Sequence, residues 1–207
     1  MAPAPDSSYY HGNLRSALLA RAEEVLAADG VDSLSLRGLA RDLGVSHGAP
    51  ARHFQDRQSL LDALALSGVQ RLDAALAACA ACAGDWSRRL RELARAYVTF
   101  ATANPALLAV MYDVKHHPDA STALRVEASR GIAILADVLR DGQQVGKVAA
   151  GDPHELALVL FAAVHGVAQL GIGDLLDGAA TDDVLDATLA LYGRGLAVGP
   201  GGVEATG

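Results

Sequence analysis

The sequence predicts an all-α protein, in which a small N-terminal three-helix unit is joined by one long helix to a larger helical unit. The 207 residues include 42 Ala and 31 Leu but only 26 β-branched residues, and Ala and Leu lose little on entering a helix. Apolar residues also recur at helical spacing almost throughout. They make up 51% of the chain while charged residues make up only 20%, so we expect self-association to cover apolar surface.

The N-terminal part is predicted to hold three short helices followed by one long one. Gly30 supplies a left-handed stop for the first helix, and Ser33 or Ser35 is placed to cap the second. Pro50 falls in the first turn of the third, where a missing N–H does the least damage. The expected helices run from Leu14 to Gly30, over residues 36–43, from Ser46 to about Phe54 and from Asp56 to about Ala83.

Five further helices are predicted in the rest of the chain, with limits set by Pro, Gly and Asn. They are expected over residues 86–103, 105–112, 119–142, 153–177 and 182–197. Residues 1–11 and 199–207 are rich in Pro, Gly and small side chains, and we expect both tails to be disordered. At about 1.5 Å per residue, the long helix that ends near Ala83 would span roughly 40 Å and bridge the two parts.

Charge is unevenly distributed along the chain. The formal net charge is −7, which by itself argues against a nucleic-acid partner. Residues 34–57 nevertheless carry a local charge of +2, and they also contain two histidines. The cations of this segment are Arg37, Arg41, Arg52 and Arg57. This short basic segment of an acidic protein is the candidate nucleic-acid contact, so the next question is what structure it forms.

Residues 33–54, SLSLRGLARDLGVSHGAPARHF, have the order of a helix-turn-helix. The first helix would bury Leu36, Leu39, Ala40 and Leu43 and end at Gly44, after which the second follows at once. In this motif the first helix supports the second, whose N-terminal residues face the major groove of DNA. Taken alone, the same pattern is equally that of a plain helical hairpin.

The wider unit resembles the DNA-binding domain of the TetR family of transcriptional regulators. From about Gly12 to Leu72 it has a leading helix, then Ser-x-x-x-Leu-Ala-x-x-Leu-Gly-Val-Ser, His-Phe and Asp-Arg-x-x-Leu-Leu. The resemblance implies a DNA-binding domain over 12–72, with its helix-turn-helix at about 35–54, and an effector-binding and dimerisation domain over 73–198. Segments 97–112 and 163–170 resemble the C-terminal domain of the WHG type, but Ala163 replaces its common tryptophan.

The resemblance assigns eight residues to DNA binding. Those that would contact phosphates or position the domain are Ser35, Arg37, Arg52, His53 and Arg57. Those nearest the base edges would be His47, Gly48 and Ala49, of which the last two are small enough for close backbone or thymine-methyl contacts. The family usually has tyrosine before the basic-His-Phe run, but this chain has Ala51, which removes one expected phosphate contact.

An effector pocket and a homodimer made by the last two helices are also implied by the resemblance. The candidate ligand-binding residues are Trp86, Tyr97, Phe100, Leu108, Met111, Tyr112, Phe161, His165 and Gln169. His165 lies in a stretch from Leu156 to Gly173 that holds no charged residue, so it is either a hydrogen-bonded core histidine or a polar contact for a ligand. The low aromatic content and the few charges there favour a small apolar effector.

Other functional classes lack the residues that they need. Cys79 and Cys82 have neither the βαβ context of a redox motif nor a second pair of zinc ligands. His116 and His117 fall in a predicted solvated loop, so we expect no metal site. The sequence shows no nucleophile–base pair, no paired carboxylates and no phosphate loop, and we expect neither catalysis nor a cofactor.

The apolar run over residues 156–173 is close to the length of a membrane span, but it lacks flanking cations and aromatic belts. We expect it to be buried between the core and a dimer partner, with Ala168 in that interface, in a cytoplasmic protein. The sequence therefore predicts a homodimeric repressor that binds pseudo-palindromic operator DNA and is released by a small apolar ligand acting through the long helix. The alternatives are a helical ligand-binding or scaffold protein without DNA binding, and an α-helical enzyme.

Overall fold

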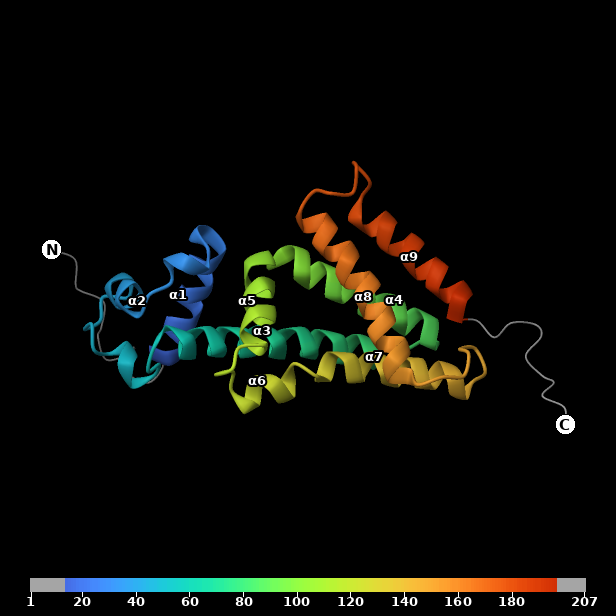
Figure 1. Cartoon of the computed structure of the whole chain (residues 1–207), viewed down its shortest axis with the longest axis horizontal. Coiled ribbons are helices and arrows are strands. Elements are labelled where there is room, and N and C mark those ends of the chain that lie inside the picture. The colour runs from blue at the N-terminus through green and yellow to red at the C-terminus, as the bar shows by residue number, and fades with distance from the viewer. Residues whose placement is uncertain (1–13, 197–207) are drawn as a thin grey trace, which may run out of the picture. The chain divides into compact units, whose positions relative to one another are not determined.

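The computed structural model describes residues 14–196, and every regular element in that range is a helix (Figure 1). The predicted all-α class is therefore confirmed. The tails predicted to be disordered, residues 1–11 and 199–207, lie outside the described residues.

The chain divides into two compact units. Unit 1 contains the residues up to Val69 together with Asn104–Arg125, and unit 2 contains Gln70–Ala103 and the residues from Val126 onward. The long helix α3 (Arg57–Ala80) contributes its first part to unit 1 and its last part to unit 2.

Unit 1 is built on the N-terminal helices. Besides the first part of α3, it contains α1 (Leu14–Asp29), η1 (Val31–Ser33), α2 (Leu36–Asp42), η2 (Pro50–Arg52), α5 (Pro105–Lys115) and most of α6 (Thr122–Glu127). Helix α1 packs against α2, η2 and α5. Fully buried side chains from these elements form its core, among them Leu18, Leu26, Leu39, Leu60 and Leu108.

Local signals set the ends of the first two helices as predicted. Gly30 has φ +79°, and its N–H donates to the carbonyl of Leu26, so α1 stops there. Of the two candidate caps, Ser35 is the one used, because its Oγ accepts from the N–H of Gly38 at 3.1 Å. Gly44, with φ +66°, turns the chain after α2.

The predicted third helix, from Ser46 to Phe54, is wrong in type and length. Residues 47–49 form turns, and only the 3-10 helix η2 follows. Pro50 has no N–H to donate to the carbonyl of Ser46, which accepts instead from Ala49, three residues on. The N–H of Arg52 likewise bonds to Ala49, so the segment is wound more tightly than an α-helix.

Helix α5 packs closely on the first part of α3 within unit 1. A Cβ on Gly68 would lie 2.7 Å from Sδ of Met111 and 3.2 Å from a methyl of Leu107, so only glycine permits this approach without a shift. The chain after α5 is tied to the same helix, because the N–H of Ser121 donates to Oδ1 of Asp62 at 2.7 Å.

Unit 2 is a bundle of four helices and the last part of α3. The four are α4 (Trp86–Ala103), α7 (Arg130–Gln144), α8 (Pro153–Ile172) and α9 (Thr181–Leu196). Helix α8 packs against the other three, and α4 packs against α7 and α9. Two ion pairs tie α4 to its neighbours: Arg89 to Asp141 at 2.8 Å, and Arg95 to Asp186 at 2.8 Å.

Four other predicted helices have different limits; one of them, predicted over residues 105–112, extends to Lys115 as α5. Residues 119–142 form α6 and α7 rather than one helix, because Ser129 Oγ and N–H both donate to the carbonyl of Val126 and tighten a turn there. Helix α8 ends at Ile172 instead of residue 177, with the N–H of Gly173 bonded to Gln169. The long helix ends at Ala80 instead of Ala83.

Helix α8 carries much apolar surface that this chain leaves uncovered. Helices α3 and α8 are both long and apolar enough to cross a membrane, but core helices of soluble proteins meet the same criterion. Only 28% of the apolar window of α8 is buried in the chain, and Leu158, Val159 and Leu170 are exposed on it. Ala168, expected from the sequence in the dimer interface, is instead fully buried in the core of unit 2.

Asp73, on the unit 2 part of α3, is the one charged side chain that is buried among the described residues. Its Oδ2 has no hydrogen-bond partner there, and a Cβ on Gly131, at the start of α7, would lie 3.4 Å from Oδ1. Burial raises the pKa of the carboxyl to about 6; Arg130 opposes the rise and Glu127 adds to it.

Stability is therefore expected to fall as pH rises from about 4 to about 6, because the folded protein holds this proton more tightly than the unfolded chain. One pKa unit corresponds to about 1.4 kcal/mol, so the charged form costs up to about 3 kcal/mol above pH 6. Asp73→Asn should be more stable than the parent at pH 7.5 and lose that advantage near pH 4. Urea unfolding at both pH values measures this; equal stability at pH 7.5 would contradict it.

Candidate functional site

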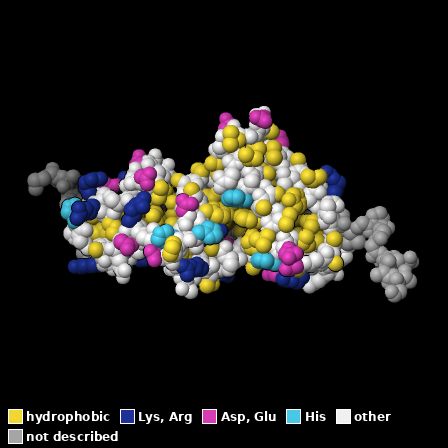
Figure 2. All heavy atoms as spheres, viewed as in Figure 1, with side chains coloured by type: hydrophobic (Ala, Val, Ile, Leu, Met, Phe, Trp, Pro, Cys, Tyr) yellow, Lys and Arg dark blue, Asp and Glu magenta, His cyan; other side chains and the backbone are white. Residues whose placement is uncertain are grey.

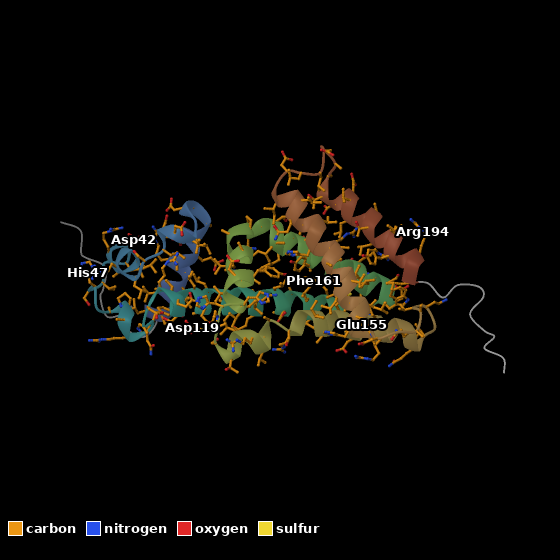
Figure 3. The ribbon with its side chains drawn as sticks, viewed as in Figure 1. Asp42, His47, Asp119, Glu155, Phe161 and Arg194 are labelled. Atoms are coloured by element: carbon orange, nitrogen blue, oxygen red, sulfur yellow. The ribbon has the colours of Figure 1, made fainter. Side chains whose placement is uncertain are left out.

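The basic segment of unit 1 exposes most of its polar side chains to solvent. Apolar residues of α2 and η2 are buried beneath it, including Leu39, Ala40 and Pro50, with Phe54 just after η2. The residues predicted to contact DNA are exposed, apart from the half-buried Ala49: Ser35, Arg37, His47, Gly48, Arg52, His53 and Arg57. In Figure 2, Lys, Arg and His side chains gather at the end of unit 1 that carries α2, and Figure 3 places His47 there.

Phe54 is the apolar anchor of this surface. Its ring is only 2% exposed, and the guanidinium of Arg15, on α1, lies 5.4 Å from the ring centroid. Because His53 and Arg52 directly precede Phe54, the buried ring fixes where these two exposed side chains lie. Phe54 is therefore the buried side chain on which this part of the basic segment rests.

Arg57 is engaged by the backbone of its own unit. Its Nε donates to the carbonyl of Leu34 at 3.1 Å, and its Nη2 donates to the carbonyl of Val31. These bonds hold the connection between α1 and α2 against the first turn of α3. Of the two roles that the sequence left open for Arg57, phosphate contact or positioning, these bonds are those of a positioning residue.

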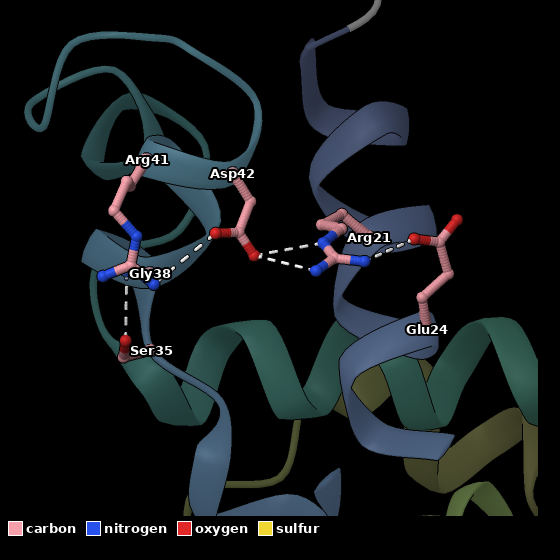
Figure 4. Close-up of polar contacts among 6 residues, drawn as sticks. All are labelled: Arg21, Glu24, Ser35, Gly38, Arg41 and Asp42. Carbon is pink, nitrogen blue, oxygen red and sulfur yellow. Dashed lines mark hydrogen bonds and ion pairs between the residues drawn. The ribbon is translucent and has the colours of Figure 1, made fainter. Parts of the chain in front are cut away.

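A cleft of about 530 Å³ lies between α1 and α2. Arg37, Arg41 and His47 line it on the side of the basic segment, and Arg21 and Asp42 also line it. Arg21 donates from Nε and Nη2 to Oδ2 of Asp42, at 3.1 and 3.0 Å (Figure 4). Arg21 and Arg41 are not among the site residues predicted from the sequence. Arg41 could have been found from the sequence, because it contributes to the positive charge of residues 34–57. Arg21 could not, because its partner Asp42 is 21 residues away and no local spacing reveals the pair.

A second candidate site lies between α4 and α8 in unit 2. Tyr97 Oη and His165 Nδ1 are 2.6 Å apart, and Phe161 meets Tyr97 edge-on, with ring centroids 5.4 Å apart. Phe161 also stacks on His165 at 5.6 Å, and Figure 3 labels it on α8. The structure thus brings together three of the nine predicted ligand-binding residues in one aromatic and polar cluster.

The other predicted ligand-binding residues lie elsewhere. Leu108 and Met111 are buried in the core of unit 1, where Met111 packs on Gly68. Tyr112, also in unit 1, lies under the ammonium of Lys115. In unit 2, Trp86 lies next to Gly142, where an added Cβ would be 3.0 Å from the indole. Phe100 lies under the guanidinium of Arg71, and Gln169 is exposed.

Cysteine and histidine residues form no further site in residues 14–196. No three His, Cys, Asp or Glu side chains in that range are grouped to hold a metal ion. Cys79 and Cys82 are free thiols, and burial raises the pKa of Cys79, with Cys82 and Glu92 adding to the rise. A raised pKa lowers the thiolate fraction and with it the reactivity of the thiol.

Two family models match the chain, one over each part. Residues 18–64 match the model of bacterial regulatory proteins of the tetR family, and residues 90–192 match the tetracyclin repressor-like C-terminal domain. No curated protein matches the chain significantly.

Solved structures share the fold over nearly the whole chain. A protein of unknown function from Rhodococcus sp. RHA1 is 46% identical, with a TM-score of 0.88 over 93% of this chain and 100% of its own. A tetR-family regulatory protein from Rhodococcus RHA1 is 22% identical, with a TM-score of 0.72 over 89% of this chain and 97% of its own. The TetR-family regulator PfmR from Thermus thermophilus is 20% identical, with a TM-score of 0.69 over 86% and 97%.

Proposed function

The chain belongs to the TetR family of bacterial regulatory proteins, and we propose that it is a repressor whose basic unit 1 surface binds operator DNA until a small apolar ligand releases it. As a member of this family it is a DNA-binding transcriptional regulator, and TetR regulators act as dimers. The single observation that carries the proposal is that Arg37, His47, Arg52 and His53 are exposed, while the neighbouring Leu39 and Phe54 are buried.

The proposed contacts divide the surface by chemistry. Arg37, Arg52 and His53 would bind phosphates. Such contacts add affinity but do not distinguish one base sequence from another. His47, Gly48 and Ala49 lie at the turn before η2 and would approach the base edges. Ser35 and Arg57 would position the domain, since the first caps α2 and the second bonds to the connection between α1 and α2.

The proposed dimer uses the apolar surface of α8 and α9. Leu158, Val159 and Leu170 of α8 and Leu191 of α9 are exposed in the chain, and Figure 2 shows hydrophobic side chains on the surface there. Two copies of this helix pair would form a four-helix interface about a two-fold axis. The two DNA-binding surfaces would then face a pseudo-palindromic operator, with half-sites about 34 Å or a multiple of it apart.

The proposed effector site is the cluster of Tyr97, Phe161 and His165. Two rings supply apolar contact and the Tyr97–His165 pair supplies one polar group, which suits an uncharged ligand of mainly apolar character. Helix α3 contributes residues to both units, so we propose that ligand binding in unit 2 is transmitted to unit 1 through it.

Replacing Arg52 tests the DNA-contact surface. Arg52→Ala is expected to weaken operator binding and to reduce the slope of log affinity against log salt by roughly one, because one phosphate contact is lost. The measurement is fluorescence anisotropy with operator DNA over a range of salt concentrations. Arg140→Ala, the same change at an exposed residue of α7 in unit 2, is a control for general effects of mutation. An unchanged slope in Arg52→Ala would contradict the proposed contact.

A further inference from the structure

Arg21 is held in a fixed place by two carboxylates. Its Nε and Nη2 both donate to Oδ2 of Asp42, and its Nη1 donates to Oε2 of Glu24 at 2.8 Å (Figure 4). The first pair joins α1 to α2, the helix that supports the DNA-contacting turn, and the second lies within α1. The guanidinium therefore bridges the two helices that form the cleft.

The position of Asp42 in α2 is electrostatically unfavourable for a carboxylate. It is the last residue of that helix, where the partial negative charge of the helix dipole makes a carboxylate unfavourable. It is also an anion inside the basic segment, beside Arg41, whose Nη2 is 3.5 Å from the other carboxylate oxygen. Arg21 supplies the charge that compensates Asp42 at this position.

The pair lies beside the proposed DNA contacts. Arg21 and Asp42 line the same cleft as Arg37, Arg41 and His47. An uncompensated carboxylate at this place would repel operator phosphates and lower the local positive potential.

We propose that Arg21, outside the DNA-contacting segment, is a positioning residue for operator binding: it neutralises Asp42, so that the cleft presents net positive charge to the phosphate backbone. This inference rests on the proposed DNA-binding surface. It predicts an interaction between Arg21 and Asp42 that appears in DNA affinity, beyond the small stability expected of an exposed ion pair.

A double-mutant cycle tests it. Arg21→Gln should weaken operator binding about tenfold, because Asp42 then keeps only its longer contact with Arg41, at 3.5 Å, and its charge near the phosphates is poorly compensated. Asp42→Asn should bind about as well as the parent, since it removes the anion that Arg21 compensates. The double variant should recover to within about threefold of the parent. Arg89→Gln breaks an Arg–Asp pair between two helices of unit 2, α4 and α7, and is the matched control.

Anisotropy at one fixed salt concentration gives the four affinities, and circular dichroism and sedimentation check that each variant is folded and dimeric. If the pair were merely structural, Arg21→Gln and Asp42→Asn would lose affinity equally and the double variant would not recover, which would overturn the inference. Parent-like binding by Arg21→Gln, while Arg52→Ala is weakened, would also overturn it and leave the proposed surface intact. Failure of the parent to bind any operator would instead count against the proposed function.

Discussion

Leu191→Asp is expected to convert the dimer into a monomer. Leu191 is 61% exposed on α9 in the single chain and would be buried against the partner in the proposed interface. A two-fold axis places the new carboxylate in the interface twice, unpaired, and each buried charge costs several kcal/mol. Sedimentation velocity should show a folded monomer, and operator affinity should fall sharply because each half-site is then bound separately.

Val145→Asp is the matched control for this experiment. Val145 is similarly exposed, at 64%, but it follows the end of α7 rather than lying on α8 or α9. The control should remain a dimer with unchanged DNA binding. Dissociation of both variants, or of neither, would be inconsistent with an interface made by α8 and α9.

Phe54→Ala is expected to unfold the DNA-contacting surface. The ring is 2% exposed and packs under Arg15, and removing such a buried aromatic side chain costs about 3–5 kcal/mol. Operator binding should be lost because η2 and the turn before it have no other buried aromatic anchor in the described part of unit 1. Denaturant unfolding, read beside operator binding, measures both effects.

His53→Ala separates anchoring from DNA contact. His53 is exposed directly beside Phe54, so its removal should weaken operator binding while leaving the free energy of unfolding nearly unchanged. A Phe54→Ala variant as stable as His53→Ala would show that the ring does not anchor the surface.

The sequence predicted most helices because their signals are local. Periodic Leu and Ala, Gly30 and Ser35 each act within one or two turns, and the structure uses them as expected. The prediction of an α-helix from Ser46 to Phe54 is wrong. Pro50 is compatible with the first turn of an α-helix, but its presence does not show that an α-helix forms there. In the structure the missing N–H favours bonds three residues apart and gives a 3-10 helix.

Features that depend on tertiary packing could not be predicted. Ala168 was expected in the interface because α8 is apolar all round, and periodicity cannot tell a face toward the core from a face toward a partner. The bonds of Arg57 to Val31 and Leu34 and of Arg21 to Asp42 join residues more than twenty positions apart. The meeting of Tyr97 with His165 likewise needed the packing of α4 on α8.

We propose that the exposed basic surface of unit 1 binds a specific operator as part of a dimer. The most direct measurement is the affinity of the purified protein for DNA flanking its own gene, compared with a scrambled duplex at physiological salt. We predict at least about 10³-fold tighter binding to the flanking DNA, saturating at one dimer per site. Equal affinity for the two duplexes, or binding by one subunit alone, would contradict the account.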